Sequence, residues 1–247
     1  MKHKRKNIVR DTWLSETLGR PVYRVVVDAA LVNGTAQARL ERARVRRMLR
    51  TRSVFAYSRV HSGDLEAATF LQDLGFRLVD TNLVFEKPLD QRRRAIGRYK
   101  ARFAESADES QTVALAGRAF TFSRFHMDPR IGRRAADRLK AEWVRNYFRG
   151  RRGDAMVVAL VGGKVAAFLL LLRSDDAAFV IDLIAVDRRF RGRGIAAAMI
   201  AFAETHCRGA KRIRAGTQIA NMPSIRMYER LGFRVSDADY LFHYHKH

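Results

Sequence analysis

The residues best suited to chemistry form a glycine- and arginine-rich turn between an apolar strand and an alanine-rich helix. Two glycines and a small alanine let backbone N–H groups approach an anion closely, and the helix N-terminus adds a positive dipole. The arginines add charge. This turn is expected to bind a pyrophosphate. The residues expected to hold it are Arg191, Gly192, Arg193, Gly194, Ile195 and Ala196.

A dinucleotide-binding site is an alternative for the same segment, because residues 192–197 nearly satisfy the pattern G-x-G-x-x-G/A. That pattern needs the turn directly after the strand and an acidic residue about 20 positions further on. The corresponding strand, Arg212 to Thr217, contains no Asp or Glu, and too little chain remains for a dinucleotide domain. The sequence therefore disfavours this alternative.

Two motifs together resemble the signatures of the GNAT superfamily of N-acetyltransferases. The pattern R/Q-x-x-G-x-G/A is matched by residues 191–196, and the pattern N…Y-E-x-x-G-F is matched by Asn221 and residues 228–233. Their order and spacing also agree. The resemblance implies the GNAT fold, an α/β (α+β) mixed sheet, and acetyl-CoA as cofactor.

The resemblance also implies a role for each part of this site. The pantetheine arm would pair with the edge of a strand that splays away from strand 212–217. Asn221 would bind the cofactor arm, and Met227 is also expected to bind the cofactor. The hydroxyl of Tyr228 would protonate the leaving thiolate, with a core tyrosine as the alternative. The strand residues expected to bind the cofactor are Leu183, Ile184, Ala185 and Val186.

The general base and the substrate contact are less defined. The resemblance points to Asp80 as the base. Asp182 is the rival, because it interrupts an apolar strand, where an unpaired carboxylate is costly and needs a partner or a cavity. A structural hydrogen bond is the alternative for Asp182. Arg124 is expected to grip a phosphate or sugar of the substrate, with a solvated loop arginine as its alternative.

Three more segments resemble the dTDP-fucosamine N-acetyltransferases, which acetylate the 4-amino group of a nucleotide-linked sugar. They are Trp13 to Gly19, Leu71 to Phe76 and Ala119 to Phe125. The resemblance implies a nucleotide amino sugar as the small-molecule substrate and a degenerate GNAT-like N-terminal half. A protein N-terminus or lysine, a polyamine and an antibiotic are alternative acceptors.

Hydrophobic periodicity predicts two units. Residues 1–88 form the degenerate GNAT-like domain, Asp90 to Arg94 a linker, and residues 96–247 the catalytic domain. The first unit is expected to contain strands at 22–27, 54–60 and 77–85 and helices at 35–52 and 64–74. The second is expected to contain strands at 99–103, 155–161, 164–172, 178–186, 212–217 and 240–244 and helices at 108–119, 135–148, 192–206 and 224–231.

A short internal sequence repeat links the two units. Residues 74–80, LGFRLVD, recur as residues 231–237, LGFRVSD. In both places a helix ends at glycine and a strand follows, so Gly75 and Gly232 are expected to adopt the left-handed conformation of a helix stop. A duplicated unit is the simplest explanation, and chance identity of two helix stops is the alternative.

Composition limits the remaining possibilities. The chain carries 48 basic residues, 39 of them arginine, against 25 acidic ones, a net charge of +23. Such a field attracts phosphate-bearing ligands and polyanions. A nucleic-acid-binding module built on helix 35–52 is an alternative function, but no interleaved aromatic residues support it. A solvated basic face explains that helix equally well.

Other expectations follow from what the sequence lacks. The longest apolar run, Val165 to Leu172, is far shorter than a membrane span, and no secretory signal is recognised. The single cysteine, Cys207, agrees with a cytoplasmic protein. The histidines are not spaced with Cys207 as metal ligands, so no metal is expected. A homodimer is compatible with these features.

Overall fold

The structure is a computed structural model that describes residues 7–89 and 99–246, and the expected linker lies outside the described residues. The chain divides into two compact units. Unit 1 comprises Met1–Asn82, Met127–Arg130 and Asp237–His247, and unit 2 comprises Leu83–His126 and Ile131–Ser236. This division differs from the expected second domain, 96–247, since the chain end groups with unit 1.

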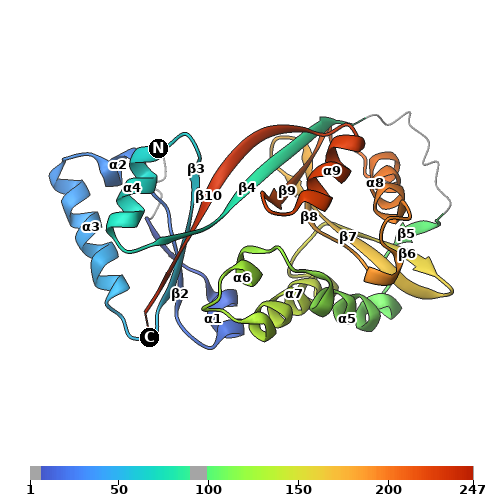
Figure 1. The fold of residues 1–247 in the computed structure, drawn as a ribbon, viewed down its shortest axis with the longest axis horizontal. Helices are drawn as coiled ribbons and strands as arrows, with labels where there is room; N and C mark the ends of the chain where they lie inside the picture. The colour runs from blue at the N-terminus through green and yellow to red at the C-terminus, as the bar shows by residue number, and fades with distance from the viewer. Residues whose placement is uncertain (1–6, 90–98, 247) are drawn as a thin grey trace. The chain divides into compact units, whose positions relative to one another are not determined.

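Unit 1 is a mixed sheet with helices on it (Figure 1), whose strands follow the order β1-β2-β3-β10. Strands β2 and β3 are parallel, whereas β1 and β10 are antiparallel to their neighbours. The elements are β1 (Ile8–Arg10), α1 (Thr12–Leu18), β2 (Val22–Val25), α2 (Ala29–Val32), α3 (Ala36–Leu49), β3 (Phe55–His61), α4 (Leu65–Asp73), the first part of β4 (Arg77–Pro88) and most of β10 (Arg234–His245).

Local sequence explains the two longest helices of unit 1. The side chain of Thr35 caps α3 by accepting a hydrogen bond from the Ala38 N–H, and Asp64 caps α4 in the same way. Helix α3 buries Ala38, Val45 and Leu49 while its arginines are mostly exposed. Its apolar stripe explains why a helix with so many charges still packs on a sheet.

Unit 2 has strands in the order β4-β9-β8-β7-β6-β5, with β8 and β9 parallel and the β5–β8 pairs antiparallel. Its elements are β5 (Ala101–Phe103), the 3₁₀ turn η1 (Ser106–Asp108), α5 (Glu109–Ala119), α6 (Arg124–Met127), α7 (Arg133–Phe148), β6 (Ala155–Val161), β7 (Lys164–Ser174), β8 (Ala178–Val186), the 3₁₀ turn η2 (Arg188–Phe190), α8 (Ile195–His206), β9 (Arg212–Gln218) and α9 (Met222–Arg230).

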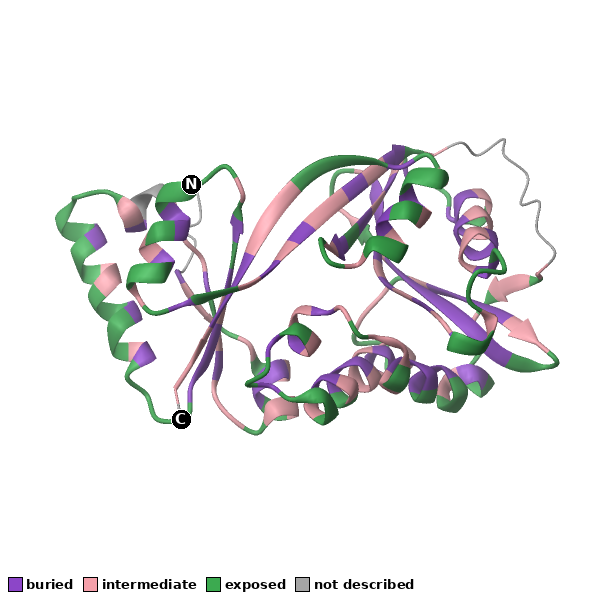
Figure 2. Cartoon of the chain, in the orientation of Figure 1, coloured by how far each residue is buried: buried purple, intermediate pink, exposed green. Residues whose placement is uncertain are grey.

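Two apolar cores cover the two faces of this sheet. One core packs under α8 and α9, and the other under α5 and α7 (Figure 2). The β6–β7 hairpin turns at Gly162 and Gly163, whose φ angles are 56° and 73°, as the Gly-Gly pair predicts. The mixed sheet and its covering helices confirm the expected α/β class.

The two segments of the short internal sequence repeat have the same backbone hydrogen bonds. After α4, the Phe76 N–H donates to Leu71 O, and after α9 the Phe233 N–H donates to Tyr228 O. Gly75 and Gly232 have φ of 86° and 85°, which confirms the expected left-handed helix stops. The order β2-α3-β3-α4-β4 is thereby repeated as β8-α8-β9-α9-β10, with the first two strands parallel in each set.

The final strand of each repeat is exchanged. Strand β10, the last of the second repeat, pairs with β3 in unit 1 from Asp239↔His61 to His245↔Phe55. Strand β4, the last of the first repeat, lies next to β9 in unit 2. Because of this exchange, residues 237–247 belong to unit 1 and residues 83–88 to unit 2.

Candidate active site

Strands β8 and β9 separate where the cofactor arm was expected. Their parallel pairing covers Ala178↔Arg212 to Ile181↔Ala215, whereas β8 stays paired with β7 as far as Val186↔Ala167. Among the described pairings, the edge of residues 183–186 that faces β9 therefore has no strand beside it. Such an edge presents backbone donors and acceptors to an extended ligand.

A β-bulge at Asp182 marks the start of this free edge. Leu171 pairs with Ile181 and Leu170 pairs with Leu183, so Asp182 is the extra residue. The bulge reverses the alternation of side chains. Ile181 lies in the core under α8, whereas Leu183 lies in the core under α5 and α7. The predicted cofactor-binding residues 183–186 thus follow directly after the irregularity.

The glycine-rich turn leads into α8 with its amides uncapped. Gly192 and Gly194 have φ of 75° and 82°, which favours glycine, and Gly194 is the N-cap of α8 without a side-chain cap. A Cβ at either glycine would meet no atom within 4 Å. The first N–H groups of a helix lack intrahelical acceptors, so open space and uncapped amides suit phosphate oxygens. Ile195 is buried and Ala196 is partly buried behind this turn.

The two arginines of the turn differ in their contacts. The guanidinium of Arg191 donates to Val186 O at 3.1 Å and to Ala119 O at 2.8 Å, which braces the turn against the end of α5. Arg193 is exposed, with its guanidinium 5.6 Å from the centroid of the Phe190 ring. Arg193 is therefore the better placed of the two to contact a ligand.

Tyr228 lies on α9 and is 2% exposed. Its ring packs against Phe85 and Phe233, with centroids 5.5 and 5.2 Å away. Burial raises the pKa of Tyr228 above its usual value, so the phenol stays protonated. A protonated phenol can donate to a thiolate, which is the role expected for Tyr228.

Asn221 and Met227 support α9. Asn221 is the N-cap of α9, and its side-chain amide donates to Thr217 Oγ1 at 3.0 Å. Met227 packs on the core under α8 and α9. These contacts position both residues on the helix that carries Tyr228.

Asp182 has the partners that its buried position requires. Arg152 donates to its two oxygens at 2.7 Å each, and the Trp143 Nε1 donates at 2.8 Å. The expectation of a partner is confirmed. Because three donors bind this carboxylate, the arrangement favours the structural alternative for Asp182 over a base.

Arg124 is half-buried on the short helix α6. Its guanidinium lies 4.4 Å from the centroid of the Phe125 ring. Nearby, Ser123 Oγ is 2.6 Å from His126 Nδ1, and His126 Nε2 is 3.0 Å from Asp137 Oδ1. Burial lowers the pKa of His126. This hydrogen-bonded chain fixes the segment that carries Arg124.

Asp80 lies on β4 within unit 1 and is 7% exposed. Its Oδ1 accepts from the Thr81 N–H at 2.8 Å, while Oδ2 and the amide nitrogen of Asn82 have no hydrogen-bond partner among the described residues. Burial raises its pKa to about 6. A carboxylate with an unused oxygen and a raised pKa has the properties of a general base.

Sequence reasoning missed Lys140, a buried lysine on α7. Of its four neighbours at spacings of three and four, Ala136, Trp143 and Val144 are apolar and at least partly buried, and the fourth is Asp137. A lysine on the apolar face of a helix was the available signal. Its proximity to Arg124, Arg152 and Asp182 follows only from the tertiary fold.

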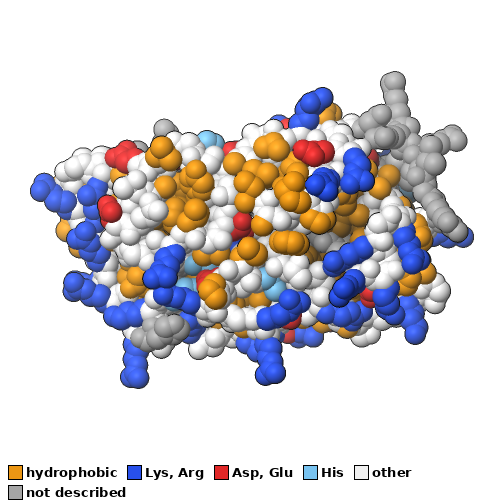
Figure 3. Space-filling model, viewed as in Figure 1, with side chains coloured by type: hydrophobic (Ala, Val, Ile, Leu, Met, Phe, Trp, Pro, Cys, Tyr) orange, Lys and Arg blue, Asp and Glu red, His pale blue; other side chains and the backbone are white. Residues whose placement is uncertain are grey.

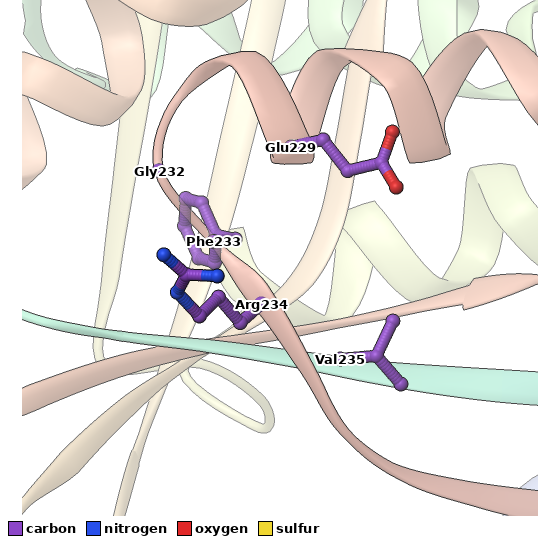
Figure 4. Close-up of a pocket in the computed structure, with 5 residues that line it drawn as sticks. All are labelled: Glu229, Gly232, Phe233, Arg234 and Val235. Carbon is purple, nitrogen blue, oxygen red and sulfur yellow. The ribbon is translucent and has the colours of Figure 1, made fainter.

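A pocket of about 440 Å³ lies one turn beyond Tyr228, where α9 meets β10. Figure 4 shows its lining, with Glu229 on the helix and Arg234 and Val235 on the strand. None of the predicted cofactor-binding residues lines it. This pocket is therefore separate from the glycine-rich turn.

One group with metal-ligand spacing occurs among the described residues: Asp128, His243 and His245, in unit 1. Both histidines lie 2.6 Å from Asp128 Oδ2. Burial raises the pKa of Asp128, but the two histidine hydrogen bonds outweigh it and hold the pKa below its usual range. Arg20 donates to His245 Nδ1 at 3.0 Å, so Nε2 carries the proton and is not free to bind a metal. A hydrogen-bonded network fits this group better than a metal site.

Positive charge is spread over several parts of the face shown in Figure 3. Helix α3 carries exposed arginines and an exposed Leu40 in unit 1. Around the glycine-rich turn, Arg193 is exposed, while Arg118 and Arg189 pair with Asp187. In the described part of the chain, no helix is both long enough and apolar enough to cross a bilayer.

Residues 121–233, which include the turn, the free edge of β8 and Tyr228, match the acetyltransferase (GNAT) family. This segment, which is a little under half of the chain, is similar to the GNAT acetyltransferases. Solved structures agree on the fold. A GCN5-related N-acetyltransferase from Sphaerobacter thermophilus superposes over 96% of this chain and 75% of its own, with a TM-score of 0.61 and 18% identity. A tandem GNAT protein from the clavulanic acid biosynthesis pathway superposes over 92% and 76%, with a TM-score of 0.62 and 16% identity.

Two curated relatives come from sugar biosynthesis. The spore coat polysaccharide biosynthesis protein SpsD of Bacillus subtilis (strain 168) is 36% identical over 56% of this chain, and the match spans about half, 48%, of that relative. The dTDP-fucosamine acetyltransferase of Escherichia coli O6:H1 is 26% identical over 73% of this chain and 75% of its own. Both are proteins to which this chain is similar.

Proposed function

We propose that the protein is an N-acetyltransferase that moves an acetyl group from acetyl-CoA directly to the amine of a nucleotide-linked amino sugar. The observation that carries the proposal is the combination of the free edge of residues 183–186 with an uncapped glycine-rich turn at the start of α8. The sugar acceptor is inferred from the two curated relatives.

The chain's own groups suit the two ends of acetyl-CoA, whose thioester supplies an activated acetyl group. The amides of residues 192–196 would hold the pyrophosphate, and Arg193 would add charge. The backbone of residues 183–186 would pair with the pantetheine arm. A backbone N–H after the bulge would polarise the thioester carbonyl.

Proton transfers are assigned to two residues. Tyr228 holds a proton at its phenol and would donate it to the departing sulfur, with Asn221 and Met227 supporting its helix. Asp80 would take the proton from the acceptor amine, directly or through water, since its Oδ2 has no hydrogen-bond partner in the part of the chain that the structure describes. Arg124 would contact the acceptor.

A thiol-release assay tests the proposal. Purified protein would be incubated with acetyl-CoA and either dTDP-4-amino-4,6-dideoxyhexoses, polyamines, aminoglycosides or peptides. We expect thiol release with the nucleotide sugars and none with the other amines. Release with another amine instead would refute the sugar acceptor but retain the acetyltransferase. If acetyl-CoA neither binds nor reacts, the cofactor assignment is wrong.

A further inference from the structure

Lys140 is a buried cation without an acceptor. It is 7% exposed, and its ammonium lies 5.0 Å from the centroid of the Phe120 ring and 4.6 Å from that of Trp143. It makes no hydrogen bond or ion pair within residues 7–89 and 99–246. Ring faces stabilise a cation in part, but the N–H donors have no oxygen acceptor among the described residues, and the ammonium is not among the fully buried atoms without a partner, so a ligand can reach it.

The carboxylate that acts electrostatically on Lys140 does not supply that acceptor. Asp182 raises the pKa of Lys140 from a distance, yet its oxygens accept from Arg152 and Trp143. Asp137, one turn earlier on α7, is engaged by His126 and Arg133. The acidic groups around Lys140 are thus already used by other donors.

Positive charge accumulates at this place. Burial is the main cause that lowers the pKa of Lys140 to about 8, and the guanidinium groups of Arg124 and Arg152 lower it further. Lys140, Arg124 and Arg152 are thus three cations close together on the side of the sheet covered by α5 and α7. Helix α8, with the pyrophosphate turn, packs on the other side. An anion at Lys140 would be a second one, separate from the cofactor's pyrophosphate.

We propose that Lys140 is a ligand-binding residue that, together with Arg124 and Arg152, forms a subsite for a phosphate group of the acyl acceptor. This inference rests on the proposed function and assigns the part of the acceptor that is recognised. A phosphate oxygen would accept from the ammonium of Lys140 and satisfy its donors. The nucleotide diphosphate, rather than the sugar, then provides most of the affinity.

Lys140→Met tests the subsite, because methionine keeps the apolar stem and removes the charge. Binding of dTDP and of coenzyme A would be measured separately by titration calorimetry. We expect Lys140→Met to weaken dTDP about 10- to 100-fold and to leave coenzyme A binding unchanged. Lys164→Met, at an exposed lysine of the β6–β7 hairpin, is the matched control and should change neither.

Proton uptake gives a readout that a structural role would not alter. An anion beside Lys140 raises its pKa, so at pH 8, where about half of these side chains are neutral, dTDP binding should take up as much as about half a proton. Calorimetry in buffers of different ionisation enthalpy measures this uptake, which Lys140→Met should abolish. Arg124→Gln, at a half-buried side chain, serves as a second variant if Lys140→Met does not fold.

The outcomes separate this inference from the proposed function. Unchanged dTDP affinity and proton uptake in Lys140→Met would overturn the subsite, even if nucleotide amino sugars are acetylated. A loss of coenzyme A affinity equal to that of dTDP would also overturn it, because the anion would then belong to the cofactor. Lys140-dependent dTDP binding without acetylation of any nucleotide amino sugar would support the subsite and refute the acceptor.

Discussion

Tyr228 combines a buried ring with a hydroxyl that has no hydrogen-bond partner within the described residues. Tyr228→Phe should therefore preserve the packing against Phe85 and Phe233 and remove only the acid. We expect kcat to fall about 10²- to 10⁴-fold with little change in the KM for acetyl-CoA or in Tm. Steady-state kinetics measure kcat and KM, and thermal melts measure Tm. A drop in Tm with normal kcat would assign Tyr228 to the core alone.

Asp80 should make stability depend on pH. Its pKa is about 6 in the folded protein and 3.8 in the reference state, so folding is penalised as the carboxyl ionises. The contribution of Asp80 to the free energy of unfolding should therefore be most favourable below about pH 4. It should fall by about 2 to 3 kcal/mol as the pH rises through 6. Asp80→Asn should flatten that change in denaturant melts. An unchanged profile would contradict the raised pKa.

The catalytic role of Asp80 is tested by rate, not by stability. If Asp80 is the base, kcat/KM should rise with pH around an apparent pKa near 6, because only the carboxylate accepts a proton. Asp80→Asn should remove that limb and lower kcat/KM about 10²-fold or more. Normal rates in Asp80→Asn would mean that Asp80 is not the base and that the amine loses its proton to water.

At the scale of elements, a substitution in the turn before α8 has two effects that can be measured separately: backbone strain lowers stability, and the added methyl group lowers cofactor affinity. Gly194→Ala forces a left-handed φ on alanine and should cost about 1 to 2 kcal/mol of stability. Its Cβ would meet no atom of the described residues within 4 Å, so the added methyl occupies open space beside the turn. We expect acetyl-CoA affinity to fall at least about tenfold, measured by calorimetry, since the backbone must approach the phosphates closely.

Gly162→Ala provides the matched control for that prediction. Gly162 also has a positive φ and no atom within 4 Å of a Cβ, but it lies in the β6–β7 hairpin. The Gly162→Ala variant should lose a similar amount of stability and keep its affinity for acetyl-CoA. Equal loss of affinity in both variants would mean that strain, rather than the phosphate approach, explains the result.

Elements with strong local signals were predictable from the sequence. Strands β6 and β8 have the predicted bounds, and α3, α4, α5 and α7 match within a few residues, because periodicity and caps are encoded locally. The short elements β1, α1, α2 and α6 were not predicted, since a few residues carry little periodicity. Strand β10 extends well beyond the predicted 240–244, because its pairing depends on distant strands.

The candidate site was predictable to a similar extent. The two glycines follow from a contiguous motif, and the splayed strand edge follows from the resemblance to the GNAT superfamily. The structure has the geometry of both. The partners of Asp182 could not be predicted, because Trp143 and Arg152 lie 39 and 30 positions away in sequence. Lys140 carried a local signal, a lysine on the apolar face of a helix, but its proximity to Arg124, Arg152 and Asp182 is likewise long-range. Long-range contacts of this kind are set by packing and not by local pattern.

At the scale of the whole molecule, the exchanged strands predict that the expected boundary does not separate two foldable parts. A fragment of residues 99–247 lacks β4, and with it Phe85 beside Tyr228 and Lys87, which donates to Leu231 O. We expect this fragment to be insoluble or unable to bind acetyl-CoA. Co-expression with residues 1–98 should restore a soluble complex, detected by co-purification. A folded, cofactor-binding 99–247 fragment would contradict the prediction.

The exchange also bears on how such a chain can evolve. The segment between β2 and α3 carries no R-x-x-G-x-G/A pattern, so the first repeat lacks the phosphate signature of the second. A repeat without the phosphate signature can ordinarily be lost from a gene. Here its strand β4 is part of the sheet of the second repeat, while β10 completes the sheet of the first. Loss of the first repeat would therefore also remove a strand from the sheet of the second repeat, so we expect the loops of the first repeat to vary in sequence more than β4 does.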